Sequence, residues 1–261
     1  MAGPVYQAPL SRMWGEQLSL TTTRASKMLP PGYHYVGVYT SLATDFRLGF
    51  GVVVKGVYYY DASEAVGSRY KNITAAMLDK TTVGSGTTLD GGATGDRLYV
   101  CLEDAGIGIY IDIVAGSPNG AASGTMTCNY RKNDDTWATT AATDGTNDLT
   151  RSLAQDGEVS FTKPTDWKRA SLGGPSNPID TSNPDAPALE GFWLQILWSA
   201  ALDSDVEIEN IWGLPVDTNY GYFDGSIHYI FPVDRRNVGA IAALLGAGTD
   251  TLNIDYLKAV Q

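Results

Sequence analysis

Apolar and polar residues alternate along much of the chain between Arg97 and Trp212. Isoleucine recurs at every second position from 107 to 113, and Phe192, Leu194, Ile196 and Trp198 repeat the same spacing. A period of two turns one face of an extended strand toward a core and the other face away from it. Clusters of Gly, Asp, Asn and Pro separate at least five such segments. This pattern predicts an antiparallel sandwich or barrel.

The expected strands continue outside this region. We expect them at Tyr33–Thr40, Phe46–Tyr60 (one strand or two), Leu98–Leu102, Ile107–Val114, Thr125–Tyr130, Glu158–Thr162, Gly191–Trp198, Val206–Trp212 and around Leu252–Tyr256. One hairpin is expected to join Ile107–Val114 to Thr125–Tyr130. A second is expected to turn at residues 133–135, where Asn and Asp tolerate the left-handed backbone of tight turns.

The sequence patterns at the two ends of the chain differ from the alternating pattern of the middle. Residues 1–45 contain Thr, Ser and the Pro30-Pro31-Gly32 break, which is typical of an extended arm. Near the other end, Asn237 is an expected N-cap for a helix over Val238–Leu245, with Gly246 after it. The expected fold is therefore an all-β, jelly-roll-like antiparallel β-sandwich over 46–215. The arm over 1–45 precedes it, and a C-terminal segment over 216–261 with one short helix and a terminal strand follows it.

Charge and hydropathy restrict the kinds of molecule that the chain is expected to bind. The chain of 261 residues has 29 acidic and 18 basic residues, a formal net charge of −11, which repels phosphate backbones and argues against nucleic acid. It has no run of 18 apolar residues, so we expect no membrane helix. The first 20 residues lack the apolar core of a secretory signal, so we expect the chain to fold in the cytoplasm in which it is made.

The two cysteines, Cys101 and Cys128, both fall in expected strands. A disulfide between neighbouring strands is possible, and two buried thiols are the simpler interpretation in a reducing compartment. The chain has no Cys-x-x-Cys and no Cys–His spacing suited to zinc.

Residues typical of catalysis are few. The histidines are His34 and His228, and neither is near a Gly-x-Ser-x-Gly elbow; the Gly-rich stretches lack the strand–loop–helix context of a phosphate-binding loop. We therefore expect a protein that is not an enzyme and requires no cofactor.

Asp203, Asp205, Glu207 and Glu209 form an acidic ladder in which a strand would project all four carboxylates from one face. The ladder could hold calcium, which prefers clustered oxygen ligands, or dock a basic partner. A solvated sheet face is the simpler interpretation. Side-by-side carboxylates fit poorly with a glycosidase, whose two carboxyl groups face each other across a sugar cleft.

Aromatic residues are the other candidate for binding. Tyr58, Tyr60, Trp137 and Trp167 are the candidates for an interaction surface, for instance one on which sugars stack. Core packing is the alternative for each of them and the default for most of the aromatics.

The order of motifs over about 95–212 resembles a β-sandwich module of tailed-bacteriophage structural proteins. The resemblance rests on the aromatic strand and Trp of 130–137, the Asp-Gly-Thr of 144–146, the Asp-Gly-Glu-Val-Ser-Phe to Pro-x-Asp-Trp segment of 156–167, and Gly-Phe-Trp-Leu-Gln-Ile-Leu at 191–197. The chain departs from the module at Gln195, where a basic residue is common, and in its proline-rich insertion before Gly191.

This resemblance implies a virion component, foremost a capsid decoration (cement) protein. Such a protein would bind the major capsid protein or other virion proteins as a homo-oligomer, a trimer being a common form. The alternative is a carbohydrate- or receptor-binding module of a tail or baseplate, and a sandwich glycosidase is a weaker third. Fold analogy alone does not decide among them.

Overall fold

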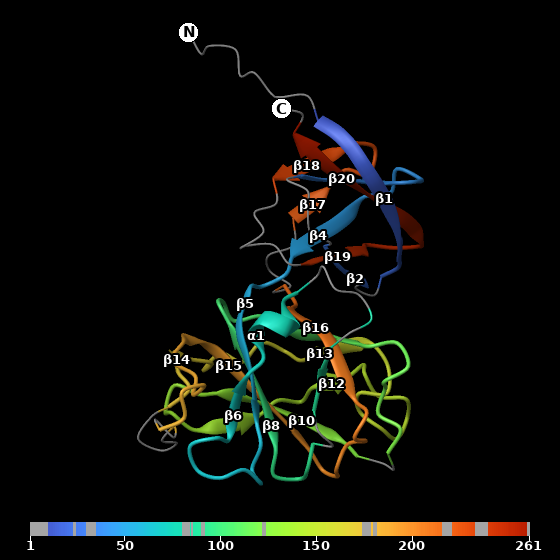
Figure 1. The fold of residues 1–261 in the computed structure, drawn as a ribbon. Helices are drawn as coiled ribbons and strands as arrows, with labels where there is room; N and C mark the ends of the chain where they lie inside the picture. Colours follow the sequence, from blue (N-terminus) through green and yellow to red (C-terminus); the bar gives the residue numbers. More distant parts are fainter. Residues whose placement is uncertain are drawn as a thin grey trace. The chain divides into compact units, whose positions relative to one another are not determined.

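The computed structural model describes residues 10–22, 25–29, 35–79, 84, 86–89, 92–121, 124–173, 179, 182–215, 221–232 and 240–259. The chain forms two compact units. Unit 1 combines Met1–Phe50 with Asp217–Gln261, and unit 2 is Gly51–Val216. Both units are built from antiparallel sheets, which confirms the all-β prediction (Figure 1).

Unit 2 contains two antiparallel sheets. The first has the order β11-β10-β15-β8-β5-β6, with β14 beside β15, and the second has the order β12-β13-β9-β16-β7. The first sheet consists of β5 (Val54–Tyr60), β6 (Tyr70–Asn72), β8 (Arg97–Leu102), β10 (Met126–Arg131), β11 (Trp137–Thr139), β14 (Arg169–Ser171) and β15 (Glu190–Trp198). The second consists of β7 (Thr87–Thr88), β9 (Gly108–Ile113), β12 (Thr143–Asp144), β13 (Gly157–Ser160) and β16 (Glu207–Gly213). In the described part of the chain, α1 (Thr74–Met77) is the one helix.

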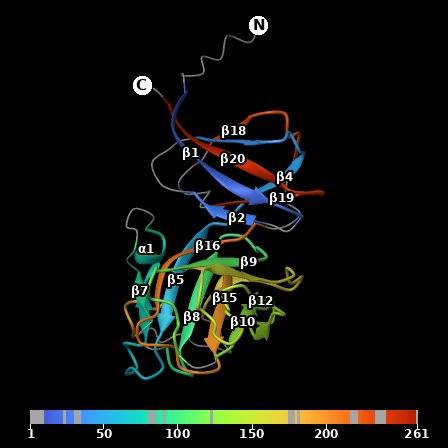
Figure 2. The ribbon, with the colours of Figure 1, turned by 90° about the vertical axis from the view of Figure 1, so that its right-hand side faces the viewer.

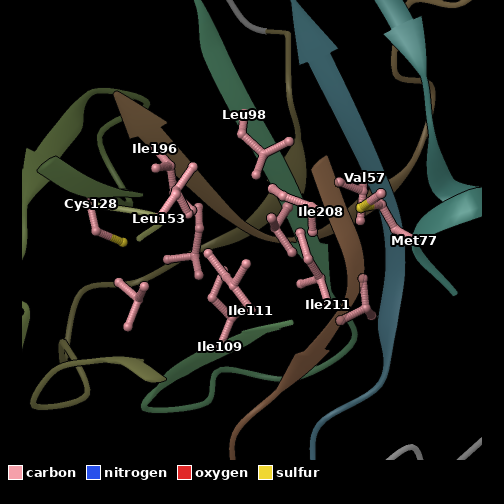
Figure 3. Packing of buried hydrophobic residues seen from close by; sticks show 14 of the residues in the cluster. Val57, Met77, Leu98, Ile109, Ile111, Cys128, Leu153, Ile196, Ile208 and Ile211 are labelled. Atoms are coloured by element: carbon pink, nitrogen blue, oxygen red, sulfur yellow. The ribbon is translucent and has the colours of Figure 1, made fainter. Parts of the chain in front are cut away.

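A single apolar core joins the two sheets of unit 2. Figure 3 shows Ile109, Ile111 and Ile208 of the second sheet lying close to Leu98 and Ile196 of the first. All five side chains are fully buried. Alternate positions of β15 supply the same core, as the spacing predicts, while Trp193 points to the other face and belongs to a separate cluster.

Unit 1 is also built from two antiparallel sheets around its own core. Their orders are β1-β20-β3-β18 and β17-β4-β19-β2. The strands are β1 (Leu10–Leu20), β2 (Ala25–Met28), β3 (Tyr35–Thr40), β4 (Phe46–Phe50), β17 (Gly221–Phe223), β18 (Tyr229–Pro232), β19 (Ala240–Leu245) and β20 (Asp250–Ala259). The core between them includes Val38, Phe46, Ile241 and Ile254. Figure 2 shows β1 next to β20 and β4 next to β19.

The segment expected to be an extended arm is largely strand where the structure describes it. β1 pairs with β20 along its length, from Leu10 opposite Ala259 to Leu20 opposite Asp250. β3 also pairs with β20. Pairing supplies backbone partners that an extended arm would lack, and Leu20 and Val38 bury their side chains in the core of unit 1. Pro30-Pro31-Gly32 lies outside the described residues.

The helix expected over Val238–Leu245 is wrong for its described part. Ala240–Leu245 is β19, which pairs with β2 on one side and β4 on the other. Alanine and leucine favour a helix, but two strand partners and burial of nearly every side chain outweigh that preference. The expected N-cap, Asn237, lies outside the described residues.

The hairpin expected between Ile107–Val114 and Thr125–Tyr130 is also wrong. β9 pairs with β13 and β16, while β10 pairs with β11 and β15, so the connection crosses from one sheet to the other. Both segments bury apolar side chains in the same core from opposite sheets. Alternation alone cannot distinguish this arrangement from a hairpin.

The second expected hairpin is confirmed. β10 pairs with β11, with Arg131 opposite Trp137, and Asp135 has the left-handed φ of 65°. Asp134 accepts hydrogen bonds from the backbone and hydroxyl of Thr136. These bonds, with one from Lys132, lower the pKa of Asp134 to about 2.

The run of alternating isoleucines does not lie on one face. Ile109, Ile111 and Ile113 belong to the main core, whereas Ile107 packs in a small cluster with Leu214 and Tyr110. The reversal occurs at Gly108, whose φ is +143°, and a Cβ at that position would lie 2.0 Å from the Val159 carbonyl oxygen. Only glycine fits this close approach, and it changes which face the preceding side chain meets.

Candidate functional site

The acidic ladder is not one row of four carboxylates on a strand. Asp203 and Asp205 precede β16, and only Glu207 and Glu209 lie on it. Glu207 accepts a hydrogen bond from Thr88 Oγ1 at 3.4 Å, and Glu209 accepts one from the Gly84 backbone at 3.2 Å. Among the residues that the structure describes, no group of three or more His, Cys, Asp or Glu lies close enough together to hold a metal ion.

Two of the four aromatic candidates have little exposed surface. Trp167 is 7% exposed; its Nε1 donates to the Trp193 carbonyl at 3.2 Å, and its ring packs against Phe161 and Phe192. Tyr58 is 5% exposed, and burial raises its pKa. Both side chains stabilise the interior and present almost nothing to a partner.

Tyr60 and Trp137 remain partly exposed, and both contact Tyr99. The Trp137 ring centroid lies 5.9 Å from that of Tyr99, and the Tyr60 centroid lies 6.5 Å from it. All three belong to the cluster on the face of the first sheet opposite the main core, which we call the outer face. The candidates that sequence analysis chose from separate segments thus meet in one place.

A row of polar and aromatic side chains crosses this outer face. Strand register places Thr139 opposite Asn129, Asn129 opposite Gln195, and Gln195 opposite Tyr99. Their neighbours along each strand, such as Cys128, Leu194 and Leu98, point into the core. The row therefore lies on a single face, because successive side chains of a strand point to opposite sides.

Hydrogen bonds connect the middle of the row. Asn129 Nδ2 donates to Gln195 Oε1 at 3.0 Å, and Gln195 Nε2 donates to the Tyr99 hydroxyl at 3.1 Å. Burial raises the pKa of Tyr99, more than the bond from Gln195 lowers it. Tyr99 therefore stays a neutral phenol at physiological pH.

Arg131 lies beneath Trp137 with a fully buried side chain. Its guanidinium carbon is 5.7 Å from the centre of the Trp137 ring, Nη1 donates to the Leu172 carbonyl at 2.7 Å, and Nη2 lies 3.5 Å from Asp135 Oδ1. Asp135 also pairs with Lys168 Nζ at 3.2 Å, so this carboxylate is shared by two cations, and the Arg131 guanidinium supports the indole.

Several polar atoms at the row have no hydrogen-bond partner. They are Asn129 Oδ1, Trp137 Nε1, Arg131 Nε and Arg131 Nη2, each inaccessible to solvent in this conformation. A buried polar atom without a partner is costly, and clusters of such atoms are uncommon in folded proteins. The combination distinguishes this row from an ordinary packed face.

The described residues between Leu172 and Leu189 pack against one half of the outer face. Leu172, Ile179, Ala186 and Leu189 pack against the cluster that includes Tyr58, Tyr70 and Trp193. Thr139 is exposed, and Asn129 and Trp137 are partly exposed. Gln195 and Tyr99 are buried, at 7% and 4% exposed, so the polar row is exposed only at its Thr139 end, beside Trp137.

Sequence analysis missed Asn129, Gln195, Tyr99 and Arg131. A signal was present, because Asn129 and Arg131 alternate with Cys128 and Tyr130, and Gln195 interrupts an otherwise apolar run. Polar residues within a strand usually indicate a solvated face. Without the register, nothing in the sequence shows that these positions line up.

Unit 1 presents a different surface. Tyr222, Ile227 and Ile230 are 69%, 46% and 47% exposed and lie on β17, the following turn and β18. Each of these strands is the last of its sheet, so its outer backbone groups lack a strand partner among the described residues. Asp45 fixes the turn by accepting bonds from the Tyr222 hydroxyl and the Gly225 backbone. We call this surface the β17–β18 edge.

The remaining candidates are the two histidines and the two cysteines. His228 Nε2 lies 3.7 Å from Asp255 Oδ2, and His34 is outside the described residues. Cys101 and Cys128 are free and buried. They point to opposite faces of the sheet, on β8 and β10 with β15 between, which excludes the disulfide.

Three comparisons with known proteins found nothing similar: no family model, no curated protein and no solved structure matches the chain. Within the described residues, no helix has the length and apolarity needed to cross a membrane.

Proposed function

We propose that the chain is a virion structural protein of a tailed bacteriophage, a capsid decoration protein that works by binding. It would bind the major capsid protein or other virion proteins as a homo-oligomer, in the form of a trimer. In this proposal unit 2 is the jelly-roll-like module, and neither catalysis nor a cofactor is involved. The motif order over 95–212 supports the virion class.

The observation that carries the docking role is the β17–β18 edge. Edge strands accept a further strand, and exposed apolar side chains mark interaction sites. Tyr222 and Ile230 point outward from the two edge strands, each on the outer face of its own sheet. Asp45 holds this turn in place, so little ordering entropy opposes binding there. A decoration protein stabilises the particle by mass action, since it binds the assembled lattice.

The test is to add the purified chain to particles stripped of it and to measure co-sedimentation and the melting temperature of the particle. We expect the wild-type chain to raise that temperature and Ile230→Lys to lose both effects. Val66→Lys is the matched control, because Val66 is 71% exposed and lies in unit 2. A chain that neither sediments with particles nor is found on them by electron microscopy contradicts the proposal.

A second candidate function is carbohydrate or receptor binding at a tail or baseplate. The observation that favours it is the exposed end of the polar row, where the partly exposed Trp137 and Asn129 lie beside the exposed Thr139. Aromatic faces with neighbouring hydrogen-bonding groups are suited to sugar rings. Binding of the purified chain to glycans distinguishes this function from the first, because it can be measured in the absence of particles.

A further inference from the structure

We propose that unit 2 binds a single tetrahedral oxyanion, a phosphate or sulfate group, at the point where β5 ends and β6 and β8 begin. The donors are the guanidinium groups of Arg69 and Arg97 and the hydroxyl of Tyr60, and we call these three residues the Tyr60 corner. The inference goes beyond both candidate functions and depends on neither, because it concerns a site apart from the β17–β18 edge and from the exposed end of the polar row.

Strand register brings the three side chains together from separate parts of the sequence. Tyr60 is the last residue of β5 and pairs with Tyr70, the first residue of β6, and with Arg97, the first residue of β8. The guanidinium carbon of Arg97 lies 5.8 Å from the centre of the Tyr60 ring. Arg69 precedes β6, and its Nη1 donates to the Tyr60 hydroxyl at 3.3 Å. Both guanidinium groups therefore meet at one phenol.

The side chains of the corner are accessible to solvent. Tyr60, Arg69 and Arg97 are each partly exposed. Besides its bond to Tyr60, Arg69 donates from Nε to the Glu64 carbonyl at 3.0 Å, and Arg97 donates from Nη1 to the Gly95 carbonyl. A guanidinium has five N–H groups. These bonds leave Nη2 of Arg69, and Nε and Nη2 of Arg97, without a hydrogen-bond partner among the described residues.

Neither arginine has a carboxylate partner in the described part of the chain. No ion pair within 4.0 Å involves Arg69 or Arg97 there, whereas Lys55, Arg151 and Arg169 each pair with a carboxylate. Two guanidinium groups at one phenol repel each other, and near a protein surface solvent screens that repulsion only in part. A bound anion would offset it.

The acidic residues near the corner have other partners. Asp61 lies 3.6 Å from Lys71 Nζ. Asp96 is buried, and its carboxylate accepts three hydrogen bonds, from one hydroxyl and two backbone N–H groups. Glu64 is exposed and contacts Arg69 through its backbone carbonyl. The two arginines are therefore not neutralised by direct contact with these described carboxylates.

The arrangement of donors suits a phosphate or sulfate group better than a carboxylate. The donors belong to three side chains, so an anion with at least three acceptor oxygens can engage all of them, whereas a carboxylate has two oxygens. Two positive charges also balance a dianion. The net charge of −11 repels a polyanion, so we expect a single oxyanion and not a nucleic acid.

The corner is held in position before any ligand arrives. The Tyr60 ring packs edge-on against two other rings, with centroids 5.1 Å away at Tyr70 and 6.5 Å away at Tyr99. The Arg69 carbonyl accepts a hydrogen bond from the Asp61 backbone at 2.9 Å. Binding therefore orders little more than the ends of two arginine side chains, which keeps its entropic cost low.

The experiment is titration calorimetry of the full chain with sodium phosphate, sodium sulfate and sodium acetate at constant ionic strength. We expect one saturable site for phosphate and for sulfate, with an affinity at least about tenfold higher than for acetate. Glucose 6-phosphate distinguishes a site that also takes an ester from one that takes only the free ion. Duplex DNA tests for binding of a polyanion.

Four variants locate the site. We expect Arg69→Gln and Arg97→Gln each to weaken phosphate binding about tenfold or more, because each removes charge-assisted donors. Arg97→Lys keeps the charge and should weaken binding less than Arg97→Gln. The matched control is Lys163→Gln, since Lys163 is an exposed cation of unit 2.

Phosphate and sulfate also stabilise proteins without a specific site, because they are excluded from protein surfaces. The comparison is therefore made among variants in the same solutions. Melting curves without added anion show that each variant is folded.

Absence of saturable phosphate and sulfate binding contradicts the inference, and so does an equal affinity for acetate. It is also contradicted if folded Arg69→Gln and Arg97→Gln bind as tightly as wild type, or if Lys163→Gln loses as much affinity as they do. Binding of DNA more tightly than phosphate would indicate a polyanion surface and overturn the assignment of a single group. Particle and glycan binding are measured separately, so failure of either proposed function is distinguishable from failure of this inference.

Discussion

Asn129 and Gln195 are joined across β10 and β15 by a hydrogen bond of 3.0 Å between their side-chain amides. Gln195 also donates to Tyr99, so Gln195→Leu leaves two partly buried polar groups without partners. We expect it to destabilise unit 2 by about 1–3 kcal/mol. Urea unfolding followed by tryptophan fluorescence measures the loss.

The control for that variant is Gln17→Leu. Gln17 and Asn253 form a similar amide pair at 3.0 Å, but on an exposed face of unit 1. We expect a change within about 0.5 kcal/mol there. Equal losses in both variants would show that burial of the Gln195 pair has no energetic importance.

Ile111 lies fully buried between the two sheets of unit 2. We expect Ile111→Ala to cost about 2–5 kcal/mol, because it removes apolar contact area and leaves a cavity. Val66→Ala, at a side chain 71% exposed, is expected to change stability by less than about 0.5 kcal/mol. Thermal unfolding distinguishes the two, and a mild effect of Ile111→Ala would contradict the packing described for the core.

Leu149 is 97% exposed and has a φ of 98°, a region that L-residues with a side chain rarely adopt. Its side chain contributes almost no packing, so glycine would relieve backbone strain without loss of contacts. We expect Leu149→Gly to be about 1 kcal/mol more stable than Leu149→Ala, which keeps a Cβ. Calorimetry of the two variants tests this; a less stable glycine variant would mean that the loop is unstrained.

Asp250 links the turn after β3 to the start of β20. Burial raises the pKa of Asp250, but hydrogen bonds from Thr251, Thr44 and Leu42 lower it by more than burial raises it. The pKa of Asp250 therefore lies below its ordinary value. A lowered folded-state pKa gives stability that is complete above the unfolded value of about 4 and is lost as the pH falls toward the folded value.

We therefore expect unit 1 to lose stability as the pH falls from about 5 to 3. Asp250→Asn should be less stable than wild type at pH 7 and should show a flatter dependence on pH. Melting temperatures across this range test the expectation. Parallel curves for the two proteins would show that another carboxylate is responsible.

Burial raises the pKa of both Cys101 and Cys128 to about 12. The thiolate is the reactive form, so both should resist an aromatic disulfide reagent at pH 8 in the folded protein. We expect two thiols to react after unfolding in urea and fewer than one before it. Rapid labelling of the native protein would show that the first sheet opens readily.

Local pattern predicted the strands well and their partners poorly. The alternation at Phe192–Trp198 and the turn at Asp135 follow from backbone geometry within a few residues, and both are confirmed. Ile107 was assigned to the wrong face because one glycine, Gly108, reverses the alternation, and the close approach of Val159 that requires it is a tertiary contact.

The candidate binding residues also show that local sequence predicts residue type but does not predict tertiary contacts. Tyr60 and Trp137 were chosen for residue type, and so were Tyr58 and Trp167, which are buried. Each pair consists of one Tyr and one Trp, so residue type cannot explain why one pair is partly exposed and the other buried. The difference comes from strand register and from the residues that pack over the sheet. The row itself depends on pairing between residues up to 96 positions apart, as in Tyr99 with Gln195.

The pairing of β1 with β20 affects the order in which the protein can be completed on the ribosome. The first strand of unit 1 has no partner until the last strand has been synthesised, whereas every strand of unit 2 is already present by then. Unit 2 can therefore fold during translation, and unit 1 can close only after β20 has been synthesised, while Leu20 waits for its place in the core.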